Sequence, residues 1–486
     1  MVKKATSLFS VDVINPDLTG RPAHIRIAER IRAAISSTAL APRARLPSSR
    51  TLSRDFGVAR NTVDEALSQL VAEGLVIRRR GAGSFVNQPP LLTRAAATPP
   101  NRKLPHRISK RAQVLRSYPG HFKPIHGVPF TPSLPPNEFF PRKTWKRLLS
   151  REAARAGAAY WDFGASNGLP ALREAIAGHA TALRGTRASA DQVIVTTSTQ
   201  QAVELAAKVL ADPGESCWVE NPGYQPVQHV LRSTGLDIVH VPVDTQGIDV
   251  AVGRQLQPQA RLTYVTPSHQ YPLGYEMSLA RREALLQWAE EQNAYILEDD
   301  YDGDYRYEGR PITSLQDMDR ERVVYVGSFN KILFPALRLA FALVPEALVA
   351  AFVDAKHVAD GHTALLCQGA LAAFISEGHL AHHLRITRTA YNERRLAFLE
   401  EARPLQGLIE WGPAQAGMHV TGFFLNQNLD DRAVAAACVA RGVMVDPLSK
   451  YGTLPRGGLV FGFAGASRET SRRGLRIVRR AITALG

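Results

Sequence analysis

The sequence predicts two domains of different fold class: a small, mostly helical N-terminal domain that ends in a hairpin, and a large α/β domain with a mostly parallel sheet. The chain has 486 residues, of which 45% are hydrophobic, and this is more than a single compact core usually contains. Before residue 87, apolar residues at helical spacing are followed by a hairpin pattern. After residue 125, short β-branched runs alternate with amphipathic helical patterns, which is typical of parallel sheets.

Positive charge is concentrated near the N-terminus. Residues 1–87 carry 14 Lys/Arg and 7 Asp/Glu, and residues 88–125 add eight basic residues but no acidic one. Because these excesses equal the net charge of +15, residues 126–486 are balanced. The distribution favours a polyanionic partner for the N-terminal part, although a solvated basic surface has the same composition.

Cysteine usage and hydropathy favour a reduced, cytoplasmic protein. The three cysteines, Cys217, Cys367 and Cys438, lie far apart and lack the spacing of metal ligands. We therefore predict neither structural disulfides nor a metal site. No apolar run approaches the roughly 18 residues of a membrane span, so no membrane partner is expected.

The N-terminal domain is expected over residues 10–87, a basic linker over 88–124 and the large domain over 125–486. The linker contains QPPLLTRAAATPPNRKLPHRISKRAQ, in which prolines and charge of one sign predict an extended chain that buries no core.

In the N-terminal domain, Ser48 or Ser49 can cap a short helix that runs through Phe56, and Gly57 makes the following turn. A second helix is predicted from residue 59 or 60, because apolar residues recur at i, i+3, i+4 and i+7, namely Val63, Ala66, Leu67 and Leu70. This spacing leaves three polar residues exposed where recognition helices contact bases and phosphates: Arg60, Asn61 and Thr62.

A hairpin is predicted over Val76–Val86, with Gly81 and Gly83 at its tip. Glycines allow a backbone to approach a phosphate chain closely. Three arginines lie beside the hairpin, and each suits a solvated surface as well as a phosphate contact: Arg78, Arg79 and Arg80.

In the large domain, strands are expected over 193–198, 262–268, 294–300, 322–329 and 338–345. Helices are expected between some of them, over 202–212 and 279–292. This order predicts helical crossover connections between parallel strands.

Lys331 and Arg338 lie within an otherwise apolar segment, GSFNKILFPALRLAF, directly after a predicted strand. Burying an unpaired ammonium group is expensive, so a partner or a covalent bond is expected for Lys331. A lysine after a strand is most often solvated, but one chemistry that uses it is a Schiff base with pyridoxal 5'-phosphate.

Each group of that cofactor has candidate partners in the chain. The phosphate needs a helix N-terminus and nearby donors, for which the candidates are Ser198, Thr199, Gln200, Ser328 and Arg338. Asp299 is the candidate for the pyridine nitrogen, Tyr301 for the phenolic oxygen and Tyr224 for the ring face. Each signal alone is weak, since the acids also suit a polar loop or a metal site and Tyr224 suits turn packing. Their order and spacing together predict a cofactor pocket.

The segments LPSSRTL, RNTV, EGLV and GAGSFV resemble the GntR-type winged helix-turn-helix. The resemblance covers almost all of the N-terminal domain and implies DNA contacts by Arg50, Arg60, Thr62 and Gly83, with Arg45 as a weaker candidate. The alternative is a helical protein-interaction domain with surface arginines.

Residues from about 130 to 486 resemble a fold-type-I aminotransferase domain, through TTSTQQA, ENPGYQP, VTPSHQYPLG, LEDDYDGDYRY and GSFNKILFPALRLAF. The combination resembles the MocR/GabR subfamily of GntR-type transcriptional regulators. It implies a small C-terminal α+β subdomain, a homodimer and a Schiff base at Lys331. Tyr160 matches the position that reaches the neighbouring subunit's phosphate, and it equally suits a core tyrosine. His269 and Gln270 are expected near the cofactor without a defined role, and His383 and His419 are expected to be structural.

Two positions depart from the family pattern. Ser198 stands where relatives commonly have glycine, and its backbone N–H still suits a phosphate. Val460 stands where aminotransferases carry the arginine that binds the substrate carboxylate. A buried valine cannot pair with a carboxylate, so either another basic residue does so or the ligand is not an ordinary α-amino acid.

These observations predict a pyridoxal-phosphate-dependent regulator of double-stranded DNA, whose large domain senses a small amine or the cofactor itself. An aminotransferase with an accessory DNA-binding domain is the first alternative. A cofactor-free scaffold is the second, and the presence of Lys331, Asp299, Tyr301 and Arg338 disfavours it.

Overall fold

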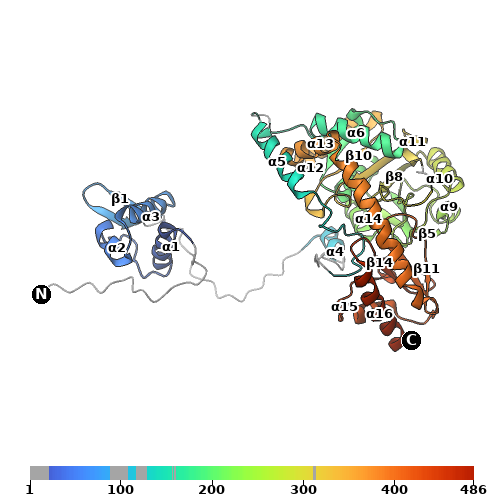
Figure 1. Cartoon of the computed structure of the whole chain (residues 1–486). Helices are drawn as coiled ribbons and strands as arrows, with labels where there is room; N and C mark the ends of the chain where they lie inside the picture. The colour runs from blue at the N-terminus through green and yellow to red at the C-terminus, as the bar shows by residue number, and fades with distance from the viewer. Residues whose placement is uncertain (1–20, 88–107, 117–127, 156, 158–159, 310–312) are drawn as a thin grey trace. The chain divides into compact units, whose positions relative to one another are not determined.

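The computed structural model describes residues 21–87, 108–116, 128–155, 157, 160–309 and 313–486 (Figure 1). The chain divides into two compact units, residues 1–107 and residues 108–486. None of the helices in the described ranges combines the length and the apolar character that crossing a bilayer requires.

The N-terminal unit contains three helices and a hairpin: α1 (Ala23–Ser36), α2 (Ser49–Phe56), α3 (Arg60–Ala72), β1 (Val76–Arg79) and β2 (Gly83–Val86). Ser48 caps α2 through its side chain, which accepts a hydrogen bond from the Thr51 N–H at 3.1 Å. Gly57 ends α2 in a left-handed conformation, with φ of 63°. Four apolar residues of α3 were predicted to face the core of the domain, and all four are buried. The predicted helix-turn-helix and hairpin are confirmed.

The large unit is built on an eight-stranded sheet in the order β3-β10-β9-β8-β7-β4-β5-β6. Its strands are β3 (Val193–Thr196), β4 (Ser216–Asn221), β5 (Asp237–Asp244), β6 (Gly247–Ile248), β7 (Leu262–Val265), β8 (Tyr295–Asp300), β9 (Val323–Ser328) and β10 (Ala340–Leu343). Strands β9, β8, β7, β4 and β5 run parallel, whereas β10 is antiparallel to both of its neighbours. The predicted mostly parallel sheet is confirmed.

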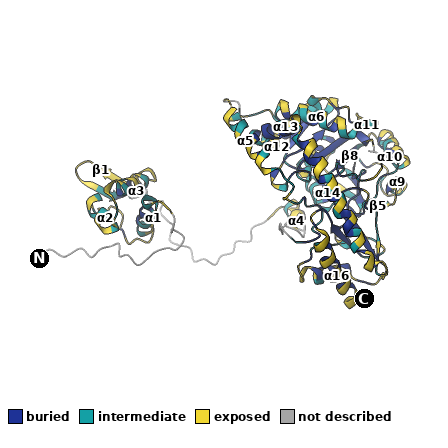
Figure 2. Ribbon diagram, in the orientation of Figure 1, coloured by how far each residue is buried: buried dark blue, intermediate teal, exposed yellow. Residues whose placement is uncertain are grey.

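Helices cover both faces of this sheet, because successive strand residues point to opposite sides. On β9, Val324 and Val326 belong to one core cluster, while Val323 and Tyr325 belong to clusters on the other face. The strands accordingly lie deep in the domain (Figure 2). The covering helices are α5 (Arg142–Arg155), α6 (Pro170–Arg184), α7 (Thr199–Leu210), α8 (Gln225–Thr234), α9 (Val250–Leu256), α10 (Leu279–Gln292), α11 (Leu315–Met318), α12 (Val349–Asp360) and α13 (Leu365–Ser376).

A smaller C-terminal part holds an antiparallel sheet in the order β11-β12-β14-β13. The long helix α14 (His379–Glu401) extends from the large sheet to this smaller one (Figure 1). The other elements are β11 (Ile409–Trp411), β12 (His419–Phe424), α15 (Asp431–Val439), β13 (Asp446–Pro447), β14 (Gly458–Gly462) and α16 (Arg468–Leu485). Short 3-10 helices lie at Ala190–Gln192, Pro335–Leu337, Glu346–Leu348, Arg403–Leu405 and Leu448–Lys450.

One part of the predicted linker is helical rather than extended. Residues Lys110–Arg116 form α4, which lies against α8. This stretch contains good helix formers and no proline, since the flanking prolines are Pro105 and Pro119. Most of the linker, residues 88–107 and 117–124, lies outside the described residues.

Candidate cofactor pocket and nucleic-acid interface

The carboxyl edge of the large sheet brings the predicted cofactor residues together. Ser328 ends β9 and Thr196 ends β3, and both lie opposite the same residue of β10, Ala340. Asp299 lies near the end of the neighbouring strand β8, opposite Val326. Ligands of α/β sheets bind at this edge, where the helices that follow the strands also begin.

The N-terminus of α7 is the predicted phosphate-binding end of the pocket. Ser198 caps this helix, and its Oγ accepts a hydrogen bond from the Gln201 N–H at 3.2 Å. Thr199 and Gln200 provide the first backbone N–H groups of the helix, which have no acceptor within it. A phosphate is the kind of ligand that such a terminus stabilises. The side-chain hydroxyl of Ser328 accepts a hydrogen bond from the Asn330 N–H at 3.3 Å.

Arg338 follows the short helix Pro335–Leu337 with a left-handed backbone, at φ of 54°. A positive φ is uncommon for a residue other than glycine and is found most often where function constrains the chain. Arg338 is exposed, so its guanidinium remains accessible to a ligand.

Asp299 has one oxygen with a partner and one without. Its Oδ2 accepts a hydrogen bond from the Tyr264 hydroxyl at 2.5 Å, whereas its buried Oδ1 has no partner among the described residues. Burial raises the pKa of Asp299 to about 7. A buried oxygen without a donor is costly, so the carboxyl group is suited to a ligand N–H such as a protonated pyridine nitrogen.

The amine of Lys331 has a main-chain partner. Its Nζ donates a hydrogen bond to the carbonyl oxygen of Ser133 at 2.9 Å, and Ser133 itself has a left-handed φ of 54°. Burial lowers the pKa of Lys331, against the smaller opposing effects of Asp302 and Asp299. A lower pKa favours the neutral amine, which is the form that condenses with an aldehyde.

His269 holds the hydroxyl of Tyr301 in place. The hydroxyl donates to the carbonyl oxygen of His269 at 3.0 Å and lies 3.0 Å from its Nδ1. The same nitrogen lies 3.1 Å from Asp302 Oδ1. His269 therefore has a positioning role that the sequence did not define, and Asp302 is a member of the pocket that sequence reasoning missed.

His419 stands beside this group on β12. Its ring centroid is 4.8 Å from that of His269, and its Nε2 lies 3.1 Å from the Pro272 carbonyl oxygen. Burial lowers the pKa of His419 to about 3, so the ring is neutral. The ligand atoms of His269, Asp302 and His419 lie within 4.8 Å of one another, and hydrogen bonds within the protein engage all three residues.

Tyrosines form the ring-binding side of the pocket. Tyr224 precedes α8, and its ring meets that of Tyr271 edge to face with centroids 5.8 Å apart. Tyr271 packs in the same way against Tyr301, at 5.7 Å. Both Tyr224 and Tyr301 pack against an apolar cluster that contains Val460 of β14, which is fully buried. The position expected for a carboxylate-binding arginine is therefore an apolar wall beside the pocket.

The remaining predicted residues make contacts within the chain. Burial raises the pKa of Tyr160, and the nearby carboxylate of Glu152 raises it further. Gln270 donates to the carbonyl oxygens of Pro222 and Tyr271, at 2.9 and 2.8 Å. His383 is buried, with Nε2 3.0 Å from the Ile332 carbonyl oxygen.

The exposed start of α3 carries the predicted DNA-reading residues. Arg60 is exposed and lies 3.8 Å from the Asp64 carboxylate one turn later, and Thr62 is half-buried. Arg50 is exposed on α2. Asp64 also accepts a hydrogen bond from the Ser49 hydroxyl at 2.7 Å, so it connects α2 with α3.

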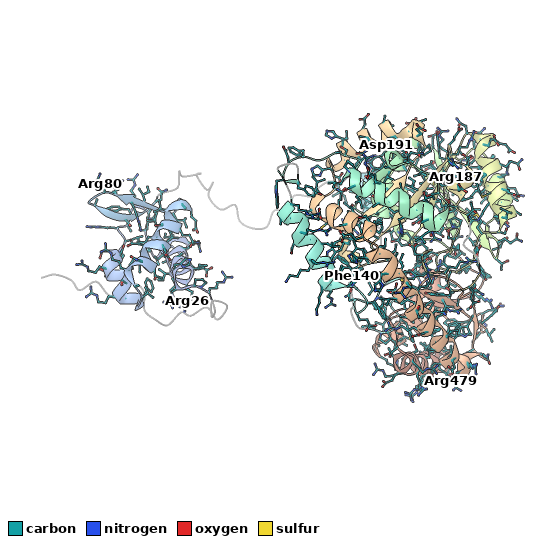
Figure 3. The ribbon with its side chains drawn as sticks, turned by 45° about the horizontal axis from the view of Figure 1, so that its top comes forward. Arg26, Arg80, Phe140, Arg187, Asp191 and Arg479 are labelled. Carbon is teal, nitrogen blue, oxygen red and sulfur yellow. The ribbon has the colours of Figure 1, made fainter. Side chains whose placement is uncertain are left out.

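The hairpin separates its three arginines into different roles. Arg78 donates to Asp64 Oδ1 at 3.2 Å, and the guanidinium of Arg79 lies over the Phe85 ring at 5.4 Å. Arg80 stands at the outer end of the hairpin and is exposed (Figure 3). Arg80 is therefore the best placed of the three to contact a phosphate.

Arg45 lies beside Gly83, which follows the turn at the tip of the hairpin. Gly83 has a φ of 106°, and a side chain there would come within 3.3 Å of the Arg45 Nε. The glycine is therefore required by the backbone conformation and gives room to an exposed arginine.

Comparison with known proteins agrees with this division. The model of the aminotransferase class I and II family matches residues 137–478, and that of the gntR family of bacterial regulatory proteins matches residues 24–86. A probable rhizopine catabolism regulatory protein from Rhizobium meliloti, MocR, is 37% identical over 96% of this chain and 94% of its own length. The regulator TauR from Rhodobacter capsulatus is 33% identical over 87% of this chain and 88% of its own.

Two further relatives concern the cofactor. The pyridoxine biosynthesis regulator PdxR from Corynebacterium glutamicum is 29% identical over 92% of this chain and 93% of its own length. The α-aminoadipate aminotransferase LysN from Thermus thermophilus, solved with N-(5'-phosphopyridoxyl)-L-leucine, superimposes with a TM-score of 0.69 and 27% identity. The superposition covers 78% of this chain and 97% of LysN.

Proposed function

The chain belongs to the MocR-type transcriptional regulators of the GntR family, in which a DNA-binding helix-turn-helix domain is joined to an aminotransferase-like domain, and we propose that its large domain binds pyridoxal 5'-phosphate and senses a small amine. Bound pyridoxal phosphate supplies an aldehyde that reacts with primary amines. The observation that carries the proposal is the buried Oδ1 of Asp299, which meets no donor in the described part of the chain and lies at the sheet edge that also holds Lys331.

The residues of the pocket fit the cofactor group by group. The N-terminus of α7 at Ser198, Thr199 and Gln200, together with Ser328 and Arg338, suits the phosphate. Asp299 suits the ring nitrogen, Tyr301 the phenolic oxygen and Tyr224 the ring face. We place the neutral amine of Lys331 at the aldehyde.

We further propose that the protein acts as a homodimer, so that two N-terminal domains read two half-sites on DNA. Effector binding in the large domain would change the relative populations of two dimer arrangements and hence the affinity for the operator. Arg45, Arg50, Arg60, Thr62 and Gly83 are the proposed DNA contacts, and Tyr160 is proposed to reach the partner subunit's phosphate site.

A working aminotransferase is the second candidate function. The likeness to LysN favours it, and the apolar wall at Val460 opposes it, because an unpaired substrate carboxylate would be desolvated there. The cofactor itself is the second candidate effector, and the named role of PdxR in pyridoxine biosynthesis supports it.

The test is the visible absorption of the purified full-length protein. We expect a yellow chromophore that Lys331→Ala abolishes and that Lys208→Ala, a surface substitution on α7, leaves unchanged. A colourless wild-type protein after incubation with pyridoxal phosphate would contradict the proposal. Steady production of keto acids from amino donors would instead favour the aminotransferase.

A further inference from the structure

The cluster that packs against Tyr224 and Tyr301 has an apolar residue, Val460, where an arginine was expected, and a carboxylate, Asp446, on the neighbouring strand. Val460 of β14 lies opposite Thr421 of β12 on one side and opposite Asp446 of β13 on the other. It is fully buried in a cluster with Tyr271 and Tyr451. A carboxylate placed against this wall would lose its water without gaining a cation.

The Asp446 carboxylate holds a hydrogen-bonded pair of buried tyrosine hydroxyls. The Tyr451 hydroxyl donates to Asp446 Oδ2 at 2.5 Å and lies 2.9 Å from the Tyr271 hydroxyl. Burial and the charge of Asp446 raise the pKa of Tyr271 and Tyr451, so both remain neutral phenols. The ring of Tyr271 also meets Tyr224 and Tyr301. The hydroxyl pair thus connects the ring of Tyr301, through Tyr271, with the Asp446 carboxylate, which is ion-paired with Lys450.

Two cations lie against rings of this cluster in the described part of the chain, and both are already paired. Lys450 lies 5.5 Å from the Tyr451 ring centroid and donates to Asp446 at 3.0 Å. Arg456 lies over the ring of Phe423 and pairs with Glu410 at 2.6 Å. An incoming carboxylate would have to displace an existing ion pair, which costs part of its binding free energy.

We propose that the effector is a primary amine without a carboxylate, which meets Val460 with carbon and the Tyr271–Tyr451 pair with a hydroxyl group. The inference rests on the proposed function of the large domain as an amine sensor and adds the chemical class of the amine. The Tyr451 proton is engaged by Asp446 and the Tyr271 proton by the Tyr451 oxygen, so the pair can accept a hydrogen bond from a ligand hydroxyl group but has no proton to donate to a carboxylate. Amino alcohols are the simplest members of this class.

The test is calorimetric titration of the full-length, cofactor-loaded protein with amines that differ in one group. The pairs are 4-amino-1-butanol with 4-aminobutanoate and alaninol with alanine. We expect each alcohol to bind at least about tenfold more tightly than its acid, because the acid leaves a charge unpaired. Equal or tighter binding of the acids would overturn the inference, and so would the absence of heat from all four compounds.

Substitutions at Val460 and Asp446 test whether these two residues cause the preference for alcohols over acids. Val460→Arg supplies the missing cation and should reverse the preference in favour of the acids, whereas Val460→Leu keeps the wall apolar and should preserve it. Asp446→Asn retains an acceptor for Tyr451 and removes the negative charge, so it should reduce the preference for the alcohols over the acids. This variant provides a test even if Val460→Arg does not fold. An unchanged preference in Asp446→Asn would overturn the part assigned to Asp446.

The outcomes separate this inference from the proposed function. A protein that never acquires the chromophore contradicts cofactor binding itself. A coloured protein that binds the acids better than the alcohols leaves cofactor binding intact and contradicts only the class of effector.

Discussion

The N-terminal domain and the large domain differ in where their charged side chains lie. In the N-terminal domain, four arginines are exposed, namely Arg45, Arg50, Arg60 and Arg80. In the large domain, three carboxyl groups are buried deeply enough for burial to raise the pKa of each to about 7, namely Glu220, Glu298 and Asp299. One domain is suited to a partner that stays outside the fold, and the other to a partner that is enclosed.

The difference has a physical consequence for how each partner is held. Exposed arginines attract DNA through a field that salt screens within about 10 Å at 0.1 M. The buried oxygen of Asp299 acts at contact distance, where dissolved ions do not reach. Raising the ionic strength should therefore release DNA and leave the proposed cofactor bound.

The largest effect is expected when the buried carboxyl group of Asp299 is removed. Asp299→Ala should weaken retention of pyridoxal phosphate about 10²–10³-fold, because a buried charged partner is lost. The measurement is the bound cofactor after dialysis, compared with Asp304→Asn in the same acidic segment. Retention equal to that of the wild type would remove Asp299 from the site.

The matching experiment removes an exposed charge from the N-terminal domain. Arg60→Ala should weaken operator binding about tenfold and lower the dependence of affinity on salt by about one ion. Arg254→Ala, which removes one surface charge from the large domain, should leave operator affinity unchanged. Both are measured by fluorescence anisotropy over a series of salt concentrations, and equal losses in the two variants would show that position does not matter.

A smaller effect distinguishes two of the three arginines of the hairpin, Arg78 and Arg80. Arg80→Ala should weaken DNA binding a few-fold by removal of about one phosphate contact, with no change in thermal stability. Arg78→Ala should also perturb the fold locally, because Arg78 is bonded to Asp64. The comparison needs operator titrations and melting curves of both variants, and indistinguishable behaviour would contradict the roles given to them.

The last prediction concerns the dependence of stability on pH. In the cofactor-free protein the pKa of Asp299 is about 7 in the folded state, above its ordinary value of 3.8. The folded state therefore binds more protons than the unfolded state between these values, so this group makes stability fall as pH rises toward 7. The slope is at most about 1.4 kcal/mol per pH unit. Asp299→Asn should flatten it in denaturation measured between pH 5 and 8, and an unchanged slope would refute the assignment.

Local pattern was sufficient to predict the elements that carry the two sites. The i, i+3, i+4 spacing in α3 and the β-branched runs of β7, β8 and β9 depend on neighbours in the chain, and these elements are confirmed. The linker helix α4 was missed because one-sign charge and nearby prolines obscured seven residues of helix-forming sequence.

Partnerships between distant residues were not predictable in the same way. Tyr264 meets Asp299 across 35 positions and Tyr271 meets Tyr451 across 180, and both contacts depend on how strands and loops are arranged in space. The contact of His269 with Tyr301 likewise requires the loop after β7 to return to the end of β8. Residue types near a motif indicate which groups are present but not which of them touch.

The two walls of the pocket belong to different sheets. The residues that suit the cofactor lie at the edge of the eight-stranded sheet, whereas Val460 and Asp446 lie on the four-stranded sheet. On the proposed assignment, mutations in the smaller sheet would alter effector preference without disturbing the cofactor residues. In evolutionary terms, this separation would let descendants of one regulator acquire new inducers while they keep the same chemistry.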